Sequence, residues 1–383
     1  MSEIYLDHAA TTAVRPEVLE AISPVLAATF GNPSGAHHVA RAARRLLDDA
    51  RDAVAAACGA RTGRTVFTAG GTEADNLAIC GAVEAAGSAA PVIVTTEIEH
   101  KAVLAAAARA AERNGGEVRL VGVDRQGVVD LDELSRAALG ATVVSVMAAN
   151  NEVGTVQPLA EVVERVRAVA PTAVLHTDAV QAAPWYDLAE MTSGFDLVSI
   201  SGHKLGGLKG TGALVLRSDV ALSAQVVGGS QERGLRAGTQ DVAGAVALAT
   251  ALAACQAERS DASAQVAARR ERFLAALAAT GRAQATVRGV EVLPGHAHVC
   301  FDGLLTEELL FGFDREGLAA SGGSSCQSGA LEASHVVVAM GCPPAAAAGA
   351  VRFTLGHHTT DAELDEAVGI IGRVCDRLVG RGA

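Results

Sequence analysis

Apolar runs of strand length alternate with stretches of helical periodicity between about residues 65 and 217. The helical stretches repeat apolar residues every three or four positions or are rich in good helix formers: Thr72–Ala86, Lys101–Asn114, Leu131–Leu139 and Leu159–Val169. The strand candidates are short and apolar: Thr65–Ala69, Val92–Thr96, Val118–Val123, Thr142–Met147, Ala173–Thr177, Leu197–Ile200 and Ala213–Leu216. Alternation of this kind predicts an α/β fold with a mainly parallel, seven-stranded sheet covered by helices on both faces.

The segments on either side of this alternation predict further helices and a second region. Upstream, residues 43–57 place apolar side chains on one face and Arg and Asp on the other, which predicts an amphipathic helix. Downstream, an alanine-rich stretch from Asp241 to about Thr280 predicts one or two helices. The remainder predicts a smaller α+β domain from four elements: strand His298–Phe301, helix Thr306–Glu316, strand Val351–Leu355 and a final helix after Asp361.

We therefore expect two domains in this chain of 383 residues. Single hydrophobic cores stop growing at about 250–300 residues, so a longer chain with this apolar content divides into separate cores. Residues 15–255 would form the large α/β domain and residues 256–383 the small one. Residues 1–14 would pack beside the small domain.

Charge and cysteine content argue against several classes of function. The chain has 31 Lys and Arg against 43 Asp and Glu, and it offers no basic tract to phosphates, so we expect no nucleic-acid partner. Its seven cysteines include no Cys-x-x-Cys pair, which disfavours a disulfide framework or a cysteine metal site. The first residues lack a signal-peptide layout, and proline and glycine interrupt the uncharged runs. We expect a cytoplasmic protein without a membrane span or a metal site.

One candidate for chemistry is the lysine of Ser201-Gly202-His203-Lys204, directly after the apolar strand Leu197–Ile200. Partial burial at the end of a strand lowers the pKa of a lysine ammonium, and the neutral amine is then available as a nucleophile for Schiff-base chemistry. Viewed alone, Lys204 is equally well explained as an ordinary loop lysine.

Two further features follow other strands, at the sheet edge where ligands bind in α/β proteins. Asp178 ends the segment 174–178. If the Schiff-base partner of Lys204 is pyridoxal phosphate, Asp178 could keep its pyridine nitrogen protonated, with Gln181 donating toward the ring oxygen. The turn Gly70-Gly71-Thr72 joins a strand to a helix, and its free N–H groups and hydroxyl could cradle a phosphate. The structural alternative for both Asp178 and Thr72 is a helix N-cap.

Three more residues have chemistry that suits such a site. His100 follows strand Val92–Thr96 and could stack on an aromatic cofactor, although a histidine here is more often structural or on the surface. Cys326 lies in the Gly/Ser-rich loop 320–329, where an exposed thiolate could attack a substrate and carry a product away. Arg352 is a charge within an apolar strand and would bind a substrate carboxylate.

In this order, the motifs resemble those of the NifS/IscS-like cysteine desulfurases, in the class V aminotransferase branch. Besides the Cys326 loop they are Tyr5–Thr12, Phe30–Ser34, Gly71–Asn76, Asn150–Gly154, Ser201–Lys204, Gln231–Thr239 and Ser334–Val336. One such motif would be weak, but this many in family order over nearly the whole chain are highly specific. The resemblance implies a fold-type I pyridoxal-phosphate enzyme, a homodimer, that converts L-cysteine to L-alanine and leaves a persulfide on the protein.

The resemblance also implies roles for residues around the cofactor ring. Lys204 would form the Schiff base with the cofactor and Asp178 would hold the pyridinium. Gln181 and Asn150 would contact the ring oxygen, and His100 would stack over the ring. His100 is also the candidate to receive the proton of the nucleophilic thiol.

Around the phosphate, the resemblance implies the turn at Gly71 and Thr72 together with Ser201 and His203. Thr239 would reach the phosphate from the other subunit of the dimer. These residues lie far apart in the sequence, so only the resemblance places them together.

On the substrate side, the resemblance implies that Asn32 and Arg352 hold the carboxylate of L-cysteine and that Cys326 attacks the sulfur. The persulfide would pass to a sulfur-acceptor protein, such as an iron–sulfur scaffold or another sulfur carrier. Two alternatives stay open: a selenocysteine lyase or cysteine-sulfinate desulfinase with the same cofactor, and a non-catalytic sulfur-carrier or scaffold protein that kept the fold.

Overall fold

A computed structural model describes residues 3–322 and 334–382 of the chain. Its large part is built on a seven-stranded sheet with the strand order β2-β8-β7-β6-β5-β3-β4. The strands are β2 (Thr65–Thr68), β3 (Val92–Thr96), β4 (Glu117–Val121), β5 (Val143–Ser145), β6 (Val174–Asp178), β7 (Leu197–Ser201) and β8 (Gly212–Leu216). All neighbours are parallel except those of β8, which runs antiparallel to both β2 and β7. The predicted mainly parallel sheet is confirmed.

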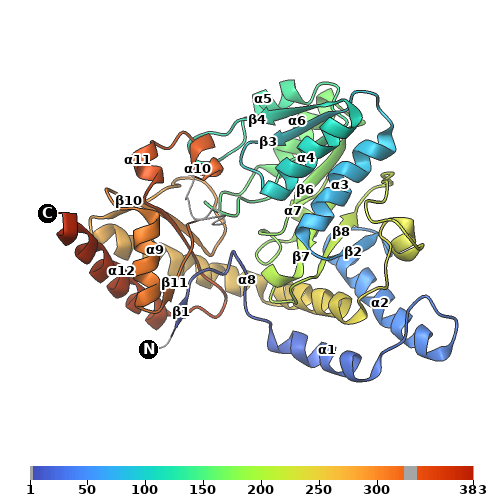
Figure 1. The fold of residues 1–383 in the computed structure, drawn as a ribbon, viewed down its shortest axis with the longest axis horizontal. Helices are drawn as coiled ribbons and strands as arrows, with labels where there is room; N and C mark the ends of the chain where they lie inside the picture. Colours follow the sequence, from blue (N-terminus) through green and yellow to red (C-terminus); the bar gives the residue numbers. More distant parts are fainter. Residues whose placement is uncertain (1–2, 323–333, 383) are drawn as a thin grey trace.

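Helices cover both faces of this sheet (Figure 1). The helices of the large part are α1 (Pro16–Ala28), α2 (His38–Ala57), α3 (Gly71–Ala86), α4 (Lys101–Asn114), α5 (Leu131–Ala137), α6 (Leu159–Val169) and α7 (Leu188–Met191). Successive strand residues point to opposite faces. Ile93 of β3 therefore packs with α3 and α4, whereas its neighbour Val94 belongs to the opposite hydrophobic cluster, which includes residues of α1, α2, α5 and α6.

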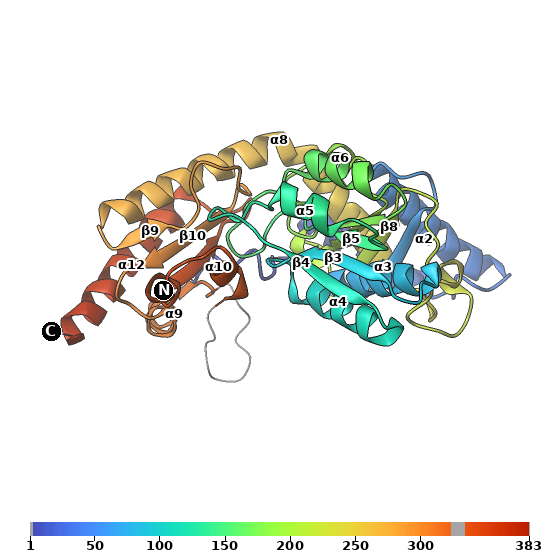
Figure 2. The ribbon, with the colours of Figure 1, turned by 90° about the horizontal axis from the view of Figure 1, so that it is seen from above.

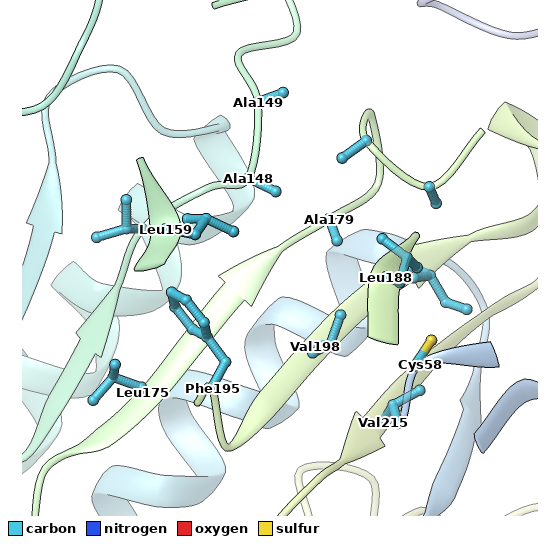
Figure 3. Close-up of a cluster of buried hydrophobic side chains, with 14 of the residues drawn as sticks. Cys58, Ala148, Ala149, Leu159, Leu175, Ala179, Leu188, Phe195, Val198 and Val215 are labelled. Atoms are coloured by element: carbon cyan, nitrogen blue, oxygen red, sulfur yellow. The ribbon is translucent and has the colours of Figure 1, made fainter. Parts of the chain in front are cut away.

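Figure 3 shows part of that second cluster, at β6 and β7. The ring of Phe195 lies beside Leu175 of β6 and Leu159 of α6, and Val198 of β7 belongs to the same cluster. These side chains are nearly inaccessible to solvent. Burial of apolar surface contributes about 25 cal/mol per Å². Such packing holds the carboxyl ends of β6 and β7 in place, and these ends carry Asp178 and Ser201.

A smaller part of the molecule contains two further sheets. One has the order β12-β10-β9, with β9 (Ala283–Ala285), β10 (His296–Phe301) and β12 (Ala350–Thr354) all antiparallel. The other pairs β1 (Ile4–Tyr5) in parallel with β11 (Leu318–Ala319), so the amino-terminal segment lies beside the carboxyl-terminal third of the chain. The helices here are α9 (Thr306–Arg315), α10 (His335–Ala339), α11 (Pro344–Ala347) and α12 (Asp361–Gly382).

One continuous helix, α8 (Val242–Ala279, 38 residues), connects the two parts. It passes from one to the other in both views (Figures 1 and 2). Its first half contributes Leu248 and Leu252 to the cluster of the large sheet, and its second half contributes Phe273 and Leu277 to the cluster of the small part. These two clusters support the division into residues 15–255 and 256–383, which we keep as a proposal.

Two 3₁₀ helices complete the elements: η1 (Gly202–Lys204) and η2 (Gln231–Gly234). The helix η1 follows β7 without a break, and it ends on the lysine that the sequence singles out. Within the described residues, no helix is long and apolar enough to cross a membrane.

Candidate active site

A cavity of about 460 Å³ lies between the two parts of the molecule. Its wall comes from the amino-terminal segment at Ala9 and Ala10, the start of α3, the loops after β5, β6 and β7, and Arg352 of β12. The carboxyl ends of parallel strands are where α/β sheets bind ligands. The volume is in the range of small-molecule sites, about 300–1,000 Å³.

Lys204 lines this cavity, at the end of η1. Its Nζ donates to the carbonyl oxygens of Ala9 and of Ala10, the latter at 2.7 Å. Burial, together with the positive charge of Arg352, lowers the pKa of Lys204 to about 8, against the opposite effect of Asp7 and Asp178. A substantial fraction of the amine is therefore neutral near pH 8 and able to act as a nucleophile.

Asp178 faces the same cavity from the end of β6 and is buried. Its Oδ1 accepts the N–H of Val180 at 2.9 Å. Burial raises the pKa of Asp178, whereas His100, this backbone hydrogen bond and Lys204 hold it down. Gln181 also lines the cavity, and its Nε2 donates to the Ala9 carbonyl at 2.9 Å.

The predicted phosphate cradle is assembled at the start of α3. Gly71, Thr72, Ser201 and His203 all line the cavity, and Gly71 and Thr72 supply the first turn of α3 with its free N–H groups. A Cβ on Gly71 would lie 2.9 Å from Cγ2 of Val180, so a side chain there would crowd the cradle. Burial lowers the pKa of His203 to about 4, with help from Lys204 and Lys209, which leaves it neutral.

His100 serves as the N-cap of α4 and lines the cavity as well. Its Nδ1 accepts the N–H of Ala102 at 3.1 Å, which fixes the direction of the ring. His100 therefore both caps α4 and forms part of the cavity wall. Because the same bond occupies the lone pair of Nδ1, a proton that arrives there must displace the Ala102 N–H.

Asn150 is a predicted cofactor residue whose side chain the structure directs away from the cavity. Its Nδ2 donates to the Ile98 carbonyl at 2.9 Å, and its Oδ1 accepts the N–H groups of Glu152 and Val153 at 2.9 and 3.0 Å. The side chain is buried and shapes the turn rather than the cavity. Its neighbour Asn151 lines the cavity in its place, which corrects this part of the sequence prediction.

Arg352 lies on β12 and lines the cavity from the small part. Its Nη2 donates to Oδ1 of Asp7 at 2.7 Å, and its Nη1 donates to the Asn151 carbonyl at 2.8 Å. It is buried, with 4% of its surface exposed. A fixed guanidinium at this place can bind the carboxylate of a ligand in the cavity.

Besides Asn150, two predicted site residues, Asn32 and Thr239, do not line the cavity, and a third, Cys326, cannot be placed. Asn32 lies in the exposed loop between α1 and α2, where its Oδ1 accepts the N–H of Ser34 at 3.0 Å. Thr239 is exposed between η2 and α8 and does not line this chain's own cavity. Cys326 lies outside the described residues. The roles of all three stay predictions.

Sequence reasoning missed a second carboxyl group on the cavity wall, that of Asp75 on α3. Burial and the nearby Asp178 raise its pKa well above the usual range, against a hydrogen bond from Ser199. Its Oδ1 lies 3.6 Å from Nε2 of His176. Asp75 belongs to the motif Gly71–Asn76, but helical position alone does not reveal that it faces Asp178.

His176, the neighbour of Asp75, is also a buried polar residue. Its two ring nitrogens bond to the hydroxyls of Ser145 and Ser199, at 2.8 and 2.9 Å. Burial lowers the pKa of His176 to about 3, so the ring is neutral. No cluster of three or more His, Cys, Asp or Glu suited to a metal ion occurs in the described part of the chain.

Comparison with known proteins identifies this arrangement. The model of the family "Aminotransferase class-V" matches residues 4–367. The "IscS-like cysteine desulfurase" of Mycobacterium tuberculosis is 40% identical over 376 residues, which are 96% of this chain and 95% of that protein. The chain belongs to the cysteine desulfurases of the class-V aminotransferase family. Members of this family depend on pyridoxal phosphate.

Other relatives agree with this assignment. The "Cysteine desulfurase IscS" of Dictyoglomus turgidum is 37% identical over 384 residues, covering 98% of this chain and 95% of that protein. A solved structure described as a NifS-like protein has a TM-score of 0.92 at 32% identity and covers 98% of this chain and 99% of that one. This chain therefore has the fold-type I architecture of a pyridoxal-phosphate enzyme.

The residues present fit the cofactor that this family uses. The cavity combines a phosphate cradle that a Cβ at Gly71 would fill, a buried carboxylate at Asp178 and an amine at Lys204 with a lowered pKa. Such a cradle binds a phosphate, such a carboxylate binds a pyridinium, and such an amine reacts with an aldehyde.

Proposed function

We propose that this cysteine desulfurase removes the sulfur of L-cysteine with Lys204 as the proton-transfer group and Cys326 as the sulfur acceptor. The observation that supports this most directly is the shared cavity of Lys204, Asp178 and Arg352. It holds an amine that is partly neutral near pH 8, a buried carboxylate and a guanidinium around one space large enough for a cofactor and an amino acid.

When bound, pyridoxal phosphate supplies an aldehyde for amines and a ring that stores electrons from the substrate. Asp178 would hold the protonated ring nitrogen, since a buried carboxylate needs a cation beside it. Gln181 and Asn151 would contact the ring oxygen, and His100 would stack over the ring. Gly71, Thr72, Ser201 and His203 would bind the phosphate.

In this proposal Lys204 takes the α-proton of the substrate and later returns a proton. Its lowered pKa suits both steps, because general acid–base groups work best near the ambient pH. The carbonyls of Ala9 and Ala10 orient its Nζ. Arg352 would meanwhile hold the substrate carboxylate, which fixes the α-carbon relative to Nζ.

Cys326 would then attack the sulfur of the substrate. A sulfur–sulfur bond forms and the carbon–sulfur bond of L-cysteine breaks. Overall, L-cysteine and the Cys326 thiol give L-alanine and a persulfide, and the β-carbon of alanine gains the hydrogen that the thiol loses. A thiol near its ordinary pKa is mostly protonated at neutral pH, so this deprotonation needs assistance.

We further propose that the persulfide passes to a sulfur-acceptor protein, with iron–sulfur cluster assembly as the purpose, and that the enzyme is a homodimer in the cytoplasm. Relatives named IscS support the first point. The exposed position of Thr239, away from this chain's own cavity, suits a residue that completes the site of a second copy.

The first test is L-alanine release from L-cysteine, with a thiol reductant to regenerate Cys326. We expect release from the native enzyme and loss of nearly all of it in Cys326→Ser, with both proteins binding pyridoxal phosphate equally. The absorbance of the bound cofactor checks that both are loaded. Cys342→Ser, which changes a half-buried thiol outside the cavity, serves as the matched control and should release alanine normally.

Other outcomes separate the alternatives. Equal release from native and Cys326→Ser enzyme would place the nucleophile elsewhere, and a strong preference for selenocysteine would then indicate a lyase. No release from loaded native enzyme would contradict L-cysteine as the substrate.

A further inference from the structure

We infer that Asp7 is a positioning residue for the substrate carboxylate, because it holds the guanidinium of Arg352 on the wall of the cavity. The inference rests on the role proposed above for Arg352. It extends that role to a residue of the amino-terminal segment, and it makes this segment part of the site that selects α-amino acids by their carboxylate.

Two of the five N–H groups of the Arg352 guanidinium donate hydrogen bonds to other described residues. Nη2 donates to Asp7 Oδ1 at 2.7 Å, and Nη1 donates to the carbonyl of Asn151 at 2.8 Å. Nε is buried and has no hydrogen-bond partner among the residues that the structure describes. Because Arg352 lines the cavity, the second N–H groups of Nη1 and of Nη2, which these two bonds leave unused, are the donors for an anion that enters it.

Asp7 is the anion that balances the charge of Arg352. The other titratable groups near Arg352 include Tyr5, His296 and His298 of β10, and Lys204. Burial lowers the pKa of His298 to about 3 and that of His296 well below its usual range, and Arg352 adds to both effects, so both rings are neutral. A buried guanidinium is costly without an anion beside it, and Asp7 supplies that anion before the substrate arrives.

The backbone holds Asp7 firmly beside β12. The N–H of Thr354 donates to the Leu6 carbonyl at 2.7 Å, and the N–H of Ala9 donates to the Thr354 hydroxyl at 2.9 Å. Asp7 itself lies opposite Thr354 in a parallel bridge. The carboxylate therefore comes from a backbone that is fixed on both sides, and it can orient Arg352 rather than follow it.

Arg352 is thereby fixed from two directions. Asp7 reaches it from the amino-terminal segment, and Asn151 reaches it from the loop after β5 in the large sheet. A planar guanidinium held at two nitrogens presents its remaining N–H groups in fixed directions. We expect a ligand carboxylate to bind to the unused N–H groups of Nη1 and Nη2, in the cavity that Lys204 also lines.

Asp7→Asn removes the negative charge and keeps the shape. Because a charge-assisted hydrogen bond holds Arg352 more firmly than a neutral one, we expect KM for L-cysteine to rise about tenfold or more in loaded enzyme, with kcat within about twofold of native. The affinity for L-alanine, measured by calorimetry, should fall by the same factor. Asp7→Glu, which keeps the charge, should recover part of both losses.

Two further variants make the result specific. Asp187→Asn weakens another Asp–Arg pair, to Arg259 at 2.9 Å, and leaves KM unchanged because Asp187 lies outside the cavity. Arg352→Ala tests the proposed function itself. If Arg352→Ala leaves KM and L-alanine affinity at native values, the role of Arg352 is wrong. If Arg352→Ala weakens both while Asp7→Asn changes neither, only the inference about Asp7 is overturned.

An opposite result is equally informative. Tighter binding of L-cysteine and L-alanine by Asp7→Asn would mean that Asp7 competes with the ligand for Arg352, and it would overturn the positioning role. Circular dichroism and thermal unfolding show whether each variant is folded. If Asp7→Asn is not, the measurements on Asp7→Glu decide: native KM and affinity despite the longer side chain would contradict a requirement for this geometry.

Discussion

At the scale of single residues, burial changes what ordinary side chains can do. Lys204 and Asp178 are an amine and a carboxylate on the wall of one cavity, and each has a pKa displaced toward its neutral form. Desolvation is the largest cause in both cases, because a charge loses the water that stabilises it. The mutual attraction of the two groups opposes this effect. The balance leaves the amine reactive near neutral pH.

A first prediction concerns the pH dependence of cofactor attachment to cofactor-free protein. Only the neutral amine of Lys204 attacks the aldehyde, and its pKa is lowered from 10.5 to about 8. We therefore expect the attachment rate to rise with pH and to level off above about pH 8, as followed by stopped-flow absorbance. Arg352→Met should move the midpoint upward, since Arg352 is the nearby charge that lowers this pKa. A native midpoint near 10.5 would contradict the assignment.

At the scale of elements, part of a family motif has a structural role rather than a chemical one. Glu232 of η2 accepts a hydrogen bond from Arg51 of α2 at 2.8 Å and another from the N–H of Phe67 of β2 at 2.9 Å. Arg236 pairs with Glu73 of α3 at 2.8 Å. The segment Gln231–Thr239 is thereby fastened to three elements of the large part. This attachment holds Thr239 at the surface in a defined place.

A second prediction follows for Glu232, whose partner Arg51 is equally buried. Removal of one member of a buried ion pair costs about 3–5 kcal/mol, so Glu232→Ala should lower the free energy of unfolding by about that amount. Asp48→Asn breaks an exposed pair with Arg44 on the same helix α2, and about 0.5 kcal/mol or less is expected. Urea unfolding measures both. Equally small losses of unfolding free energy in Glu232→Ala and Asp48→Asn would contradict a structural role for Glu232.

The same pair has a pH dependence with a definite sign. Burial raises the pKa of Glu232, but the hydrogen bonds from Arg51, from Gln240 and from the Phe67 N–H outweigh it, so the pKa in the folded protein lies below the usual 4.5. The stabilisation is therefore present above pH 4.5 and is lost as the pH falls through the lower, folded value. Above pH 4.5, titration of Glu232 should therefore not change the difference in free energy of unfolding between the native protein and Glu232→Ala.

At the scale of the whole molecule, the cavity belongs to neither part alone. The large sheet supplies Lys204 and Asp178, β12 of the small part supplies Arg352, and the amino-terminal segment supplies the carbonyls that orient Lys204. The helix α8 connects the two hydrophobic clusters and so fixes the distance between these groups. A change in the packing of α8 would therefore alter the site without touching it.

A third prediction tests whether a second copy completes the site. In a homodimer with Thr239 acting across the interface, a heterodimer of Lys204→Ala and Thr239→Val chains has one site with both residues intact. We expect mixtures of the two inactive or weakened proteins, unfolded and refolded together, to recover up to about half of the native activity per heterodimer. If Thr239 acted within its own chain, no site would be restored and the mixture would stay at the level of its components.

Much of the fold was predictable because its signals are local. The alternation of strands and helices identified all seven strands of the large sheet, and the helices Lys101–Asn114 and Leu159–Val169 have the predicted bounds. Hydrophobic periodicity reports which residues are buried, and burial decides secondary structure in a sheet covered on both faces. The short strands β1, β9 and β11 were not predicted, because two or three residues carry no periodicity.

The sequence by itself determined the family, the cofactor chemistry and most of the cavity residues, since these belong to motifs with local order. Only the tertiary structure decided which side chains of those motifs face the cavity: Asn151 rather than Asn150, Asp75 beside Asp178, and Asp7 on Arg352. Arg352 and Asp7 are 345 positions apart. Their contact follows from the pairing of the amino-terminal segment beside β12, and the direction of Asn150 follows from its hydrogen bonds to a turn. Both depend on which residues lie next to each other in three dimensions, and local residue patterns do not report this.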